Sequence, residues 1–257
     1  MKKIWITSLA RDEKLVGGLM GTARKYGLDA NGHFWLDDLK NMAWQTPGES
    51  ILDPATGLWV ILGSEKDLQS LSVRYGLALL TLTVQARKGY GFHILWLCTD
   101  GALKTEALPT PLRSAEIVTV TDPTIGAKMV ARANTPAPNV DLEYRLDIHA
   151  NPGYGVWLEI GPGKGGEWKG SLLGVHEGDI DAHGVGRAGR LPQKCILEYP
   201  MKGLKMNLGA REFVAWSVQN RLDETLSYYA RIKGVPKTFL FGQYAQDEQA
   251  EVHVFEL

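Results

Sequence analysis

The stretch Leu58–Leu80, LWVILGSEKDLQSLSVRYGLALL, decides the fold. It begins with five apolar residues in succession, which is the pattern of a strand buried on both faces. Gly63 ends that run, Ser64 and Asp67 have the spacing of a helix capping box, and the helical pattern continues to about Lys88. A buried strand followed directly by a long helix is the repeating unit of a parallel sheet that helices cover on both faces.

Similar patterns lie on either side of this stretch. Lys3–Ser8 (KIWITS) predicts a buried strand, and Asp12–Tyr26 places leucines on one face of a helix. Phe92–Leu97 (FHILWL) and Ala115–Val120 (AEIVTV) are further strand candidates. Because crossovers between parallel strands are right-handed, we expect a doubly wound α/β domain over residues 1–131.

The pattern changes at RANTPAPNV, residues 132–140, which predicts a linker. Residues 141–257 contain short strand-like runs separated by glycine and proline, as is typical of an antiparallel β domain. Within them, residues 210–233 repeat apolar side chains at helical spacing, and Gly234 follows. The predicted fold class is therefore an α/β domain followed by a mainly antiparallel β domain with one long helix.

Composition excludes several classes of protein. The chain has 257 residues, a formal net charge of −1 and 22% charged residues, which argues against a global nucleic-acid or membrane-surface binder. Its longest uncharged apolar stretch, Tyr75–Gln85, is shorter than the roughly 20 residues that span a bilayer. Cys98 and Cys195 are far apart and fit no metal or redox spacing. We expect a cytoplasmic protein without a membrane segment.

The glycine-rich stretch Glu159–Gly170 (EIGPGKGGEWKG) has some features of a phosphate-binding loop. Gly161 and Gly166 have the separation of the Walker glycines, but Glu167 and Trp168 stand where lysine and serine or threonine are needed. No helical pattern follows, although a helix N-terminus is part of such a site. The stretch predicts a hairpin connection and not a nucleotide site.

The carboxyl edge of the predicted parallel sheet is the first candidate site, because ligands of open α/β sheets bind there. Hydroxyls and carboxylates at this edge can hold a nucleotide or perform acid–base chemistry, although helix caps and turns use the same residue types. If the protein is an enzyme, Glu65 and Asp100 are the candidate acids. The candidate ligand-binding residues are Thr7, Ser8, Ser64, Glu65, Thr99 and Asp100, with Cys98 beside them.

A second candidate site lies in residues 176–183, HEGDIDAH. In an extended strand Asp179, Asp181 and His183 project to the same face, where two carboxylates and an imidazole can bind a divalent metal. A solvated strand face explains the same residues.

A third candidate is a local basic segment that can contact nucleic acid or another polyanion. A solvated face of the β domain explains it equally well. Its residues are Arg187, Arg190, Lys194, Lys202 and Lys205.

The first half, from Met1 to about Val130, resembles a Toll/interleukin receptor (TIR) domain, which has a flavodoxin-like α/β fold. The similarity rests on Lys3–Val16 (KIWITSLARDEKLV) as first strand and acidic-start helix, and on Gly32–Asp38 (GHFWLDD) as second strand and loop. It rests also on Leu58–Leu80 as third strand and helix. FHILWL, and LPTPL before the last strand-like run, complete it.

The chain departs from this family at one informative position. TIR domains that cleave NAD carry a glutamate within the helix after the third strand. The matching segment here, Ser70–Leu77 (SLSVRYGL), holds Arg74, and Glu65 lies earlier. The resemblance therefore implies a domain without the hydrolase chemistry, which leaves self-association, partner recognition or nucleotide binding.

These observations predict a non-catalytic binding or assembly module that resembles a degenerate TIR-like signalling or defence protein. It would recognise a protein partner, associate with itself, or bind a nucleotide-like ligand, and it would need no cofactor. One alternative is an NAD hydrolase that uses Glu65 or Asp100 at the sheet edge. Another is a metal-dependent hydrolase built on Asp179, Asp181 and His183.

Overall fold

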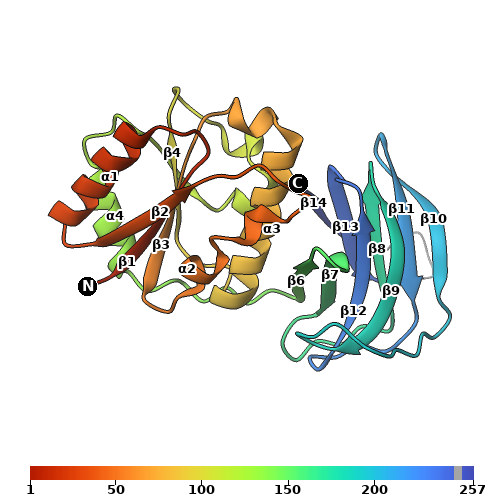
Figure 1. Cartoon of the computed structure of the whole chain (residues 1–257). Helices are drawn as coiled ribbons and strands as arrows, with labels where there is room; N and C mark the ends of the chain where they lie inside the picture. Colours follow the sequence, from red (N-terminus) through yellow and green to blue (C-terminus); the bar gives the residue numbers. More distant parts are fainter. Residues whose placement is uncertain (246–250) are drawn as a thin grey trace. The chain divides into compact units, whose positions relative to one another are not determined.

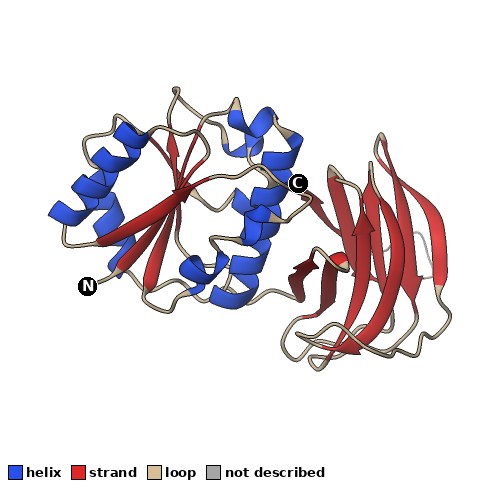
Figure 2. Cartoon of the chain, in the orientation of Figure 1, coloured by secondary structure: helices blue, strands red, loops and turns tan. Residues whose placement is uncertain are grey.

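The computed structural model describes residues 1–245 and 251–257, which form two compact units, residues 1–140 and 141–257 (Figure 1). Among these residues every helix belongs to the first unit, and the second is built from strands (Figure 2). The predicted class, α/β followed by a mainly antiparallel β part, is confirmed. No helix in the described ranges combines the length and the apolarity that crossing a bilayer requires.

The first unit contains a five-stranded parallel sheet with the strand order β2-β1-β3-β4-β5. This is the flavodoxin-like doubly wound order, in which the direction of winding reverses between β1 and β3. The strands are β1 (Lys3–Ser8), β2 (Asp29–Phe34), β3 (Thr56–Gly63), β4 (Ile94–Cys98) and β5 (Glu116–Thr119).

Helices cover both faces of this sheet because alternate residues of its strands are apolar on each side. On one face Val60 packs with Leu19 and Met129, which come from α1 (Glu13–Lys25) and α4 (Ile125–Asn134). The opposite face carries Trp59 and Trp96, both fully buried. The remaining helices are α2 (Gly48–Leu52), α3 (Leu71–Lys88) and the short 3-10 helices η1 (Ala43–Gln45), η2 (Asp67–Gln69), η3 (Thr105–Ala107) and η4 (Thr110–Leu112).

The predicted hydrogen bonds between Ser64 and Asp67 form, but they do not cap α3. The backbone N–H and the hydroxyl of Ser64 each donate to a carboxylate oxygen of Asp67 at 2.7 Å, and the Asp67 N–H donates back to the hydroxyl. Asp67 is the first residue of the short η2, whose N-cap is Lys66, and α3 begins only at Leu71, with Ser70 as its N-cap.

Helix α4 continues into the segment predicted as a linker, residues 132–140. It ends at Asn134, and Thr135 is already extended, with ψ 130°. Pro136 explains this boundary, because a residue that precedes proline is disfavoured in the helical conformation.

The second unit is a β-sandwich of two antiparallel sheets, ordered β6-β7-β12-β9 and β10-β11-β8-β13-β14. Tyr144 of β6 contacts Phe241 of β13, and His183 of β9 contacts Trp216 of β11, so these side chains lie between the sheets. The strands are β6 (Tyr144–Asn151), β7 (Gly155–Pro162), β8 (Ser171–His176), β9 (Asp179–Arg187), β10 (Met201–Leu208), β11 (Arg211–Val218), β12 (Leu226–Lys233), β13 (Thr238–Gln243) and β14 (His253–Glu256).

The helix predicted over residues 210–233 is wrong. That segment forms β11 and β12, which belong to different sheets. Val214, Val218, Leu222 and Leu226 are spaced by four, which fits one face of a helix and equally fits one face of a strand. Pairing with neighbouring strands decides between the helix and the strand. Between β11 and β12, Asp223 forms a turn by accepting the backbone N–H of Thr225.

The glycine-rich stretch is not followed by a helix, as predicted, but it is not a hairpin. It joins β7 of the four-stranded sheet to β8 of the five-stranded sheet. On the way Trp168 pairs with Leu222 in an isolated bridge. Glycine is required at Gly163, because a Cβ there would lie 2.1 Å from the carbonyl oxygen of Leu142.

Candidate functional site

The hydroxyls predicted at the carboxyl edge of the parallel sheet are occupied by the chain itself. Thr7 is fully buried, and its hydroxyl accepts the indole N–H of Trp59 at 2.8 Å. Ser8 is also buried and donates to the carbonyl oxygen of Ala10 at 2.7 Å. Ser64 is held by Asp67 as described above. These three hydroxyls therefore serve the fold.

At the β1/β3 switch point, the place where flavodoxin-like domains bind ligands, a half-buried leucine packs over the end of β3. Leu9 follows β1 directly, and its backbone N–H donates to Leu62 of β3 at 2.9 Å. A Cβ at Gly63 would lie 2.5 Å from a methyl carbon of Leu9 and 3.0 Å from the ring of Trp96. Glycine at this strand end thus admits the leucine.

Glu65, Thr99 and Asp100 do lie at this edge, and all three are exposed. The thiol of Cys98 lies 3.7 Å from a carboxylate oxygen of Asp100. Burial, and then the charges of Asp100 and Glu65, raise the pKa of that thiol. A raised thiol pKa disfavours the thiolate, so Cys98 is a poor nucleophile.

Arg74, which the resemblance matched with the glutamate of NAD-cleaving TIR domains, makes a structural contact. Its guanidinium donates to the carbonyl oxygen of Ala107 at 2.5 Å and so ties α3 to η3. Two residues earlier, the hydroxyl of Ser72 donates to Asp37, in the loop after β2, at 2.6 Å. This part of α3 therefore holds η3 and the loop after β2 by hydrogen bonds.

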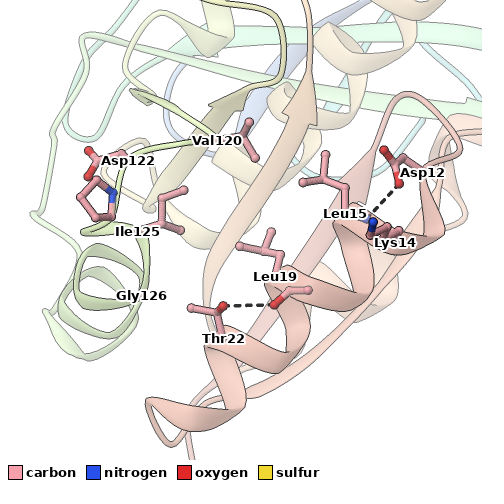
Figure 3. Close-up of a pocket in the computed structure, with 11 residues that line it drawn as sticks. Asp12, Lys14, Leu15, Leu19, Thr22, Val120, Asp122, Ile125 and Gly126 are labelled. Carbon is pink, nitrogen blue, oxygen red and sulfur yellow. Dashed lines mark hydrogen bonds between the residues drawn. The ribbon is translucent and has the colours of Figure 1, made fainter.

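A groove of about 630 Å³ lies between α1 and α4, on the sheet face opposite Trp59 (Figure 3). Its volume is within the range of ligand-binding pockets. Gly18 leaves open space, since a Cβ there would meet nothing within 4 Å, whereas the ring of Tyr26 packs against Gly126, where a Cβ would lie 2.2 Å from it. The apolar lining residues are Leu15, Leu19, Val120 and Ile125.

Acidic residues stand at the two helix N-termini on the rim of this groove. Asp12 accepts the N–H of Leu15 at 2.9 Å, and Asp122 accepts the N–H of Thr124 at 2.7 Å. Hydrogen bonds from Thr124 hold the pKa of Asp122 below its usual range. These carboxylates take up the N–H groups that a phosphate would use at a helix N-terminus. The groove therefore disfavours anionic ligands.

Helix α1 carries three glycines, Gly17, Gly18 and Gly21, that no contact within the structure requires. A Cβ at any of them would meet nothing within 4 Å. Each glycine in a helix interior costs about 1 kcal/mol relative to alanine. The sequence reasoning missed this helix as part of a site, although GGLMG within an amphipathic helix is a visible signal.

The side chains of Asp179, Asp181 and His183, which were predicted as metal ligands, do not all lie on one face of the sheet. A β-bulge makes Asp181 an extra residue opposite β12, since Arg231 pairs with Ala182 and Ile232 with Ile180. Asp181 therefore binds Arg231 on the outer face at 2.6 Å, and His183 contacts Tyr228 between the sheets. The expectation of one shared face is wrong because the bulge shifts the alternation.

The basic residues proposed as a polyanion contact lie on two strands of different sheets and on the segment that joins them. Arg187 ends β9, and Arg190 and Lys194 follow it. Lys202 and Lys205 lie on β10, the first strand of its sheet, where a register shift occurs between Met201 and Leu204. Lys202 sits 4.9 Å from the ring of Trp216, and Lys205 pairs with Glu212 at 3.6 Å.

A polar cluster that the sequence reasoning missed lies on the outer face of the four-stranded sheet. At its centre Glu159 is 3% exposed and accepts hydrogen bonds from Gly189 N–H and from the hydroxyl of Ser227, both at 2.7 Å. His149 Nε2 lies 2.5 Å from its other oxygen. Burial alone would raise the pKa of Glu159, but these hydrogen bonds hold it below its usual range. The alternation of polar and apolar residues in DIHA, residues 147–150, was the signal in the sequence for this polar cluster.

Two histidines make the stability of the fold sensitive to pH. Burial lowers the pKa of both His33 and His183 to about 4, and the charge of Lys202 adds to the shift at His183. His33 Nδ1 accepts the indole N–H of Trp5 at 3.1 Å, which requires an unprotonated nitrogen.

We expect the protein to lose stability as the pH falls from about 6.5 to 4. In this window the unfolded chain protonates His33 and His183 and the folded chain does not, so acid favours unfolding. The lowered pKa of Glu159 adds to this loss only from the ordinary value of 4.5 downward, which is below the pH range of the test. Denaturant unfolding between pH 7 and pH 5 tests this, with the double variant His33→Gln/His183→Gln as the comparison. An unchanged pH dependence in the variant would contradict the assignment.

The sequence matches no protein-family model and no curated protein. The groove, the leucine at the switch point and the polar cluster are therefore the features that bear on function.

Proposed function

We propose that the protein is a non-catalytic binding module and that the α1/α4 groove receives an apolar segment of a partner protein. One observation carries the proposal: the groove is open and apolar, whereas at the β1/β3 switch point Leu9 packs over the end of β3. This fits the degenerate TIR-like character that the first half resembles, in which partner recognition remains and hydrolase chemistry does not.

The charges at the groove favour a peptide over a nucleotide. Asp12 and Asp122 place two carboxylates at the rim, against a single lysine, Lys14, among the residues that line it. A phosphate would meet both carboxylates, while a lysine or arginine next to an apolar segment would be attracted by them. The expected occupant is a peptide with apolar residues beside a basic one.

The alternative of an NAD hydrolase has less support. Its candidate acids, Glu65 and Asp100, are exposed, whereas catalytic carboxylates commonly lie in sites that exclude water. In the matching helix Arg74 takes part in a structural hydrogen bond. Incubation with NAD is the direct control, and consumption that Glu65→Gln abolishes would overturn the non-catalytic proposal.

Filling the groove should abolish peptide binding without loss of stability. Gly18 lines the groove and Gly17 does not, yet a Cβ at either position meets nothing within 4 Å. Peptides are selected from a displayed random library, and their affinities are measured for the wild type, Gly18→Leu and Gly17→Leu. We expect Gly18→Leu to weaken binding by about tenfold or more, because its side chain occupies the peptide's place. Gly17→Leu should bind like the wild type.

Both substitutions replace a helical glycine by leucine and should raise stability by a similar amount, roughly 0.5–1 kcal/mol. Weaker binding by Gly18→Leu alone therefore cannot come from unfolding. Peptides that bind both variants equally, or a library that gives no peptide, would contradict the proposal. A dimer of the wild type that Gly18→Leu dissociates would identify a second copy of the chain as the occupant instead.

A further inference from the structure

The outer face of the four-stranded sheet brings three metal-ligating side chains together. Asp147 of β6 is directly opposite Glu159 of β7, and His149 lies two residues along β6 on the same face. One ligand atom from each residue lies within 4.8 Å of those of the other two. The positions are fixed by strand register and not by a flexible loop.

This cluster is sheltered, which is unusual for the outer face of a sandwich. The segment after β9 packs on the outer face of that strand, since a Cβ at Gly184 would lie 3.1 Å from the sulfur of Cys195, and one at Gly186 would lie 2.6 Å from Pro192. From there the backbone N–H of Gly189 reaches Glu159 and donates to it. Glu159 is thus held in a buried place by fixed hydrogen-bond donors.

We propose that Asp147, His149 and Glu159 bind one divalent transition-metal ion, with Zn²⁺ as the best fit. An imidazole with two carboxylates suits Zn²⁺ and related ions, whereas Mg²⁺ and Ca²⁺ prefer oxygen ligands alone. Three protein ligands leave a coordination position for water. The site lies in the second unit and is independent of the α1/α4 groove.

The side chains must adjust by about an ångström to take the geometry of a zinc site. Zinc–ligand bonds of about 2.0–2.2 Å at tetrahedral angles place ligand atoms about 3.4 Å apart, so separations of up to 4.8 Å must close. The contact of 2.5 Å between His149 Nε2 and Glu159 must open by a similar amount, because the ion takes a place between these two atoms. Ser227 and Gly189 hold the other oxygen of Glu159, which fixes the orientation of the carboxylate.

Arg145 adds a positive charge close to the proposed metal ligands. Its guanidinium lies on the same face and donates to the hydroxyl of Ser227 at 3.2 Å and to the carbonyl oxygen of Leu226 at 2.9 Å. The two carboxylates outweigh this single positive charge. The net charge of the two carboxylates and the guanidinium is about −1, which favours a dication over an anion.

Titration of the full-length, chelator-treated protein with ZnCl₂ alone tests the proposal by calorimetry. We expect one equivalent of Zn²⁺ to bind, and MgCl₂ to give no comparable heat. His149→Ala should weaken binding by about 100-fold or more, since loss of an outer partner alone typically costs 10–100-fold. His176→Ala is the matched control, because His176 is a partly exposed histidine 3.6 Å from a glutamate, Glu177, on the same unit.

A second readout separates ligation from folding. Co²⁺ bound by the imidazole and carboxylates should give visible absorption that His149→Ala and Asp147→Asn remove, while circular dichroism shows that both variants are folded. Absence of Zn²⁺ binding to the wild type overturns the proposal. So does binding that His149→Ala leaves unchanged, or binding that His176→Ala removes.

Discussion

Replacement of Trp59 by alanine is expected to lower the free energy of unfolding of the α/β unit by about 4 kcal/mol, the middle of the range for truncation of a buried aromatic side chain. Trp59 is fully buried at the centre of the parallel sheet, so its removal leaves a large cavity. It also leaves the hydroxyl of Thr7 without its partner. Thr7 is itself fully buried, and the lost hydrogen bond adds to the cost of the cavity.

Hydrogen exchange followed by mass spectrometry measures this effect in each unit separately. Protection should fall in peptides from residues 1–140. Two further variants separate the ring from its hydrogen bond. Trp59→Phe keeps most of the apolar volume and should cost about 1–2 kcal/mol, while Trp59→Phe/Thr7→Val removes both polar partners and should recover part of that loss. If Trp59→Phe is as damaging as Trp59→Ala, the volume argument fails.

Replacement of Glu159 by alanine is expected to destabilise the β-rich unit by about 3 kcal/mol. The substitution removes the acceptor for the hydroxyl of Ser227, which is fully buried, and for the N–H of Gly189. The segment after β9 loses its attachment to the sheet at the same time. Exchange protection should therefore fall first in residues 188–200 and in the neighbouring strands.

Glu159→Gln is the control for this variant. It preserves shape and keeps one carbonyl acceptor, so we expect about half the loss of Glu159→Ala, since charged hydrogen bonds contribute more than neutral ones. The surface substitution Glu177→Gln, at a carboxylate paired with Lys237 and half exposed, should change stability by less than about 0.5 kcal/mol. If Glu177→Gln lowered the stability as much as Glu159→Gln, burial would not be the cause of the effect at Glu159.

The sequence predicted those elements whose pattern is local. Lys3–Ser8 was predicted as a strand and is β1, and the helix predicted over Asp12–Tyr26 is α1, because each has one dominant periodicity. The prediction of a helix over residues 210–233 failed because a spacing of four residues suits both a helix and a strand. Only strand pairing over long sequence distances settles that choice, and pairing cannot be read from a single segment.

The candidate sites show the same limit. Topology placed Glu65, Thr99 and Asp100 at the carboxyl edge, where they do lie. It could not show that Leu9 packs over Gly63 at the switch point, because that depends on how one side chain turns after β1. Nor could it show that the α1/α4 groove opens on the other side of the strands, or that Asp147 and His149 face Glu159, which depends on the register of β6 and β7.

The position of β10 at the end of its sheet has a consequence for the behaviour of the protein in concentrated solution. The free backbone groups of an edge strand can pair with a strand of another molecule and so begin aggregation. The register shift after Met201 interrupts a straight template, and the exposed charges of Lys202 and Lys205 repel a second β10 laid alongside. The lysines first considered as a polyanion contact thus protect the chain from templated self-assembly.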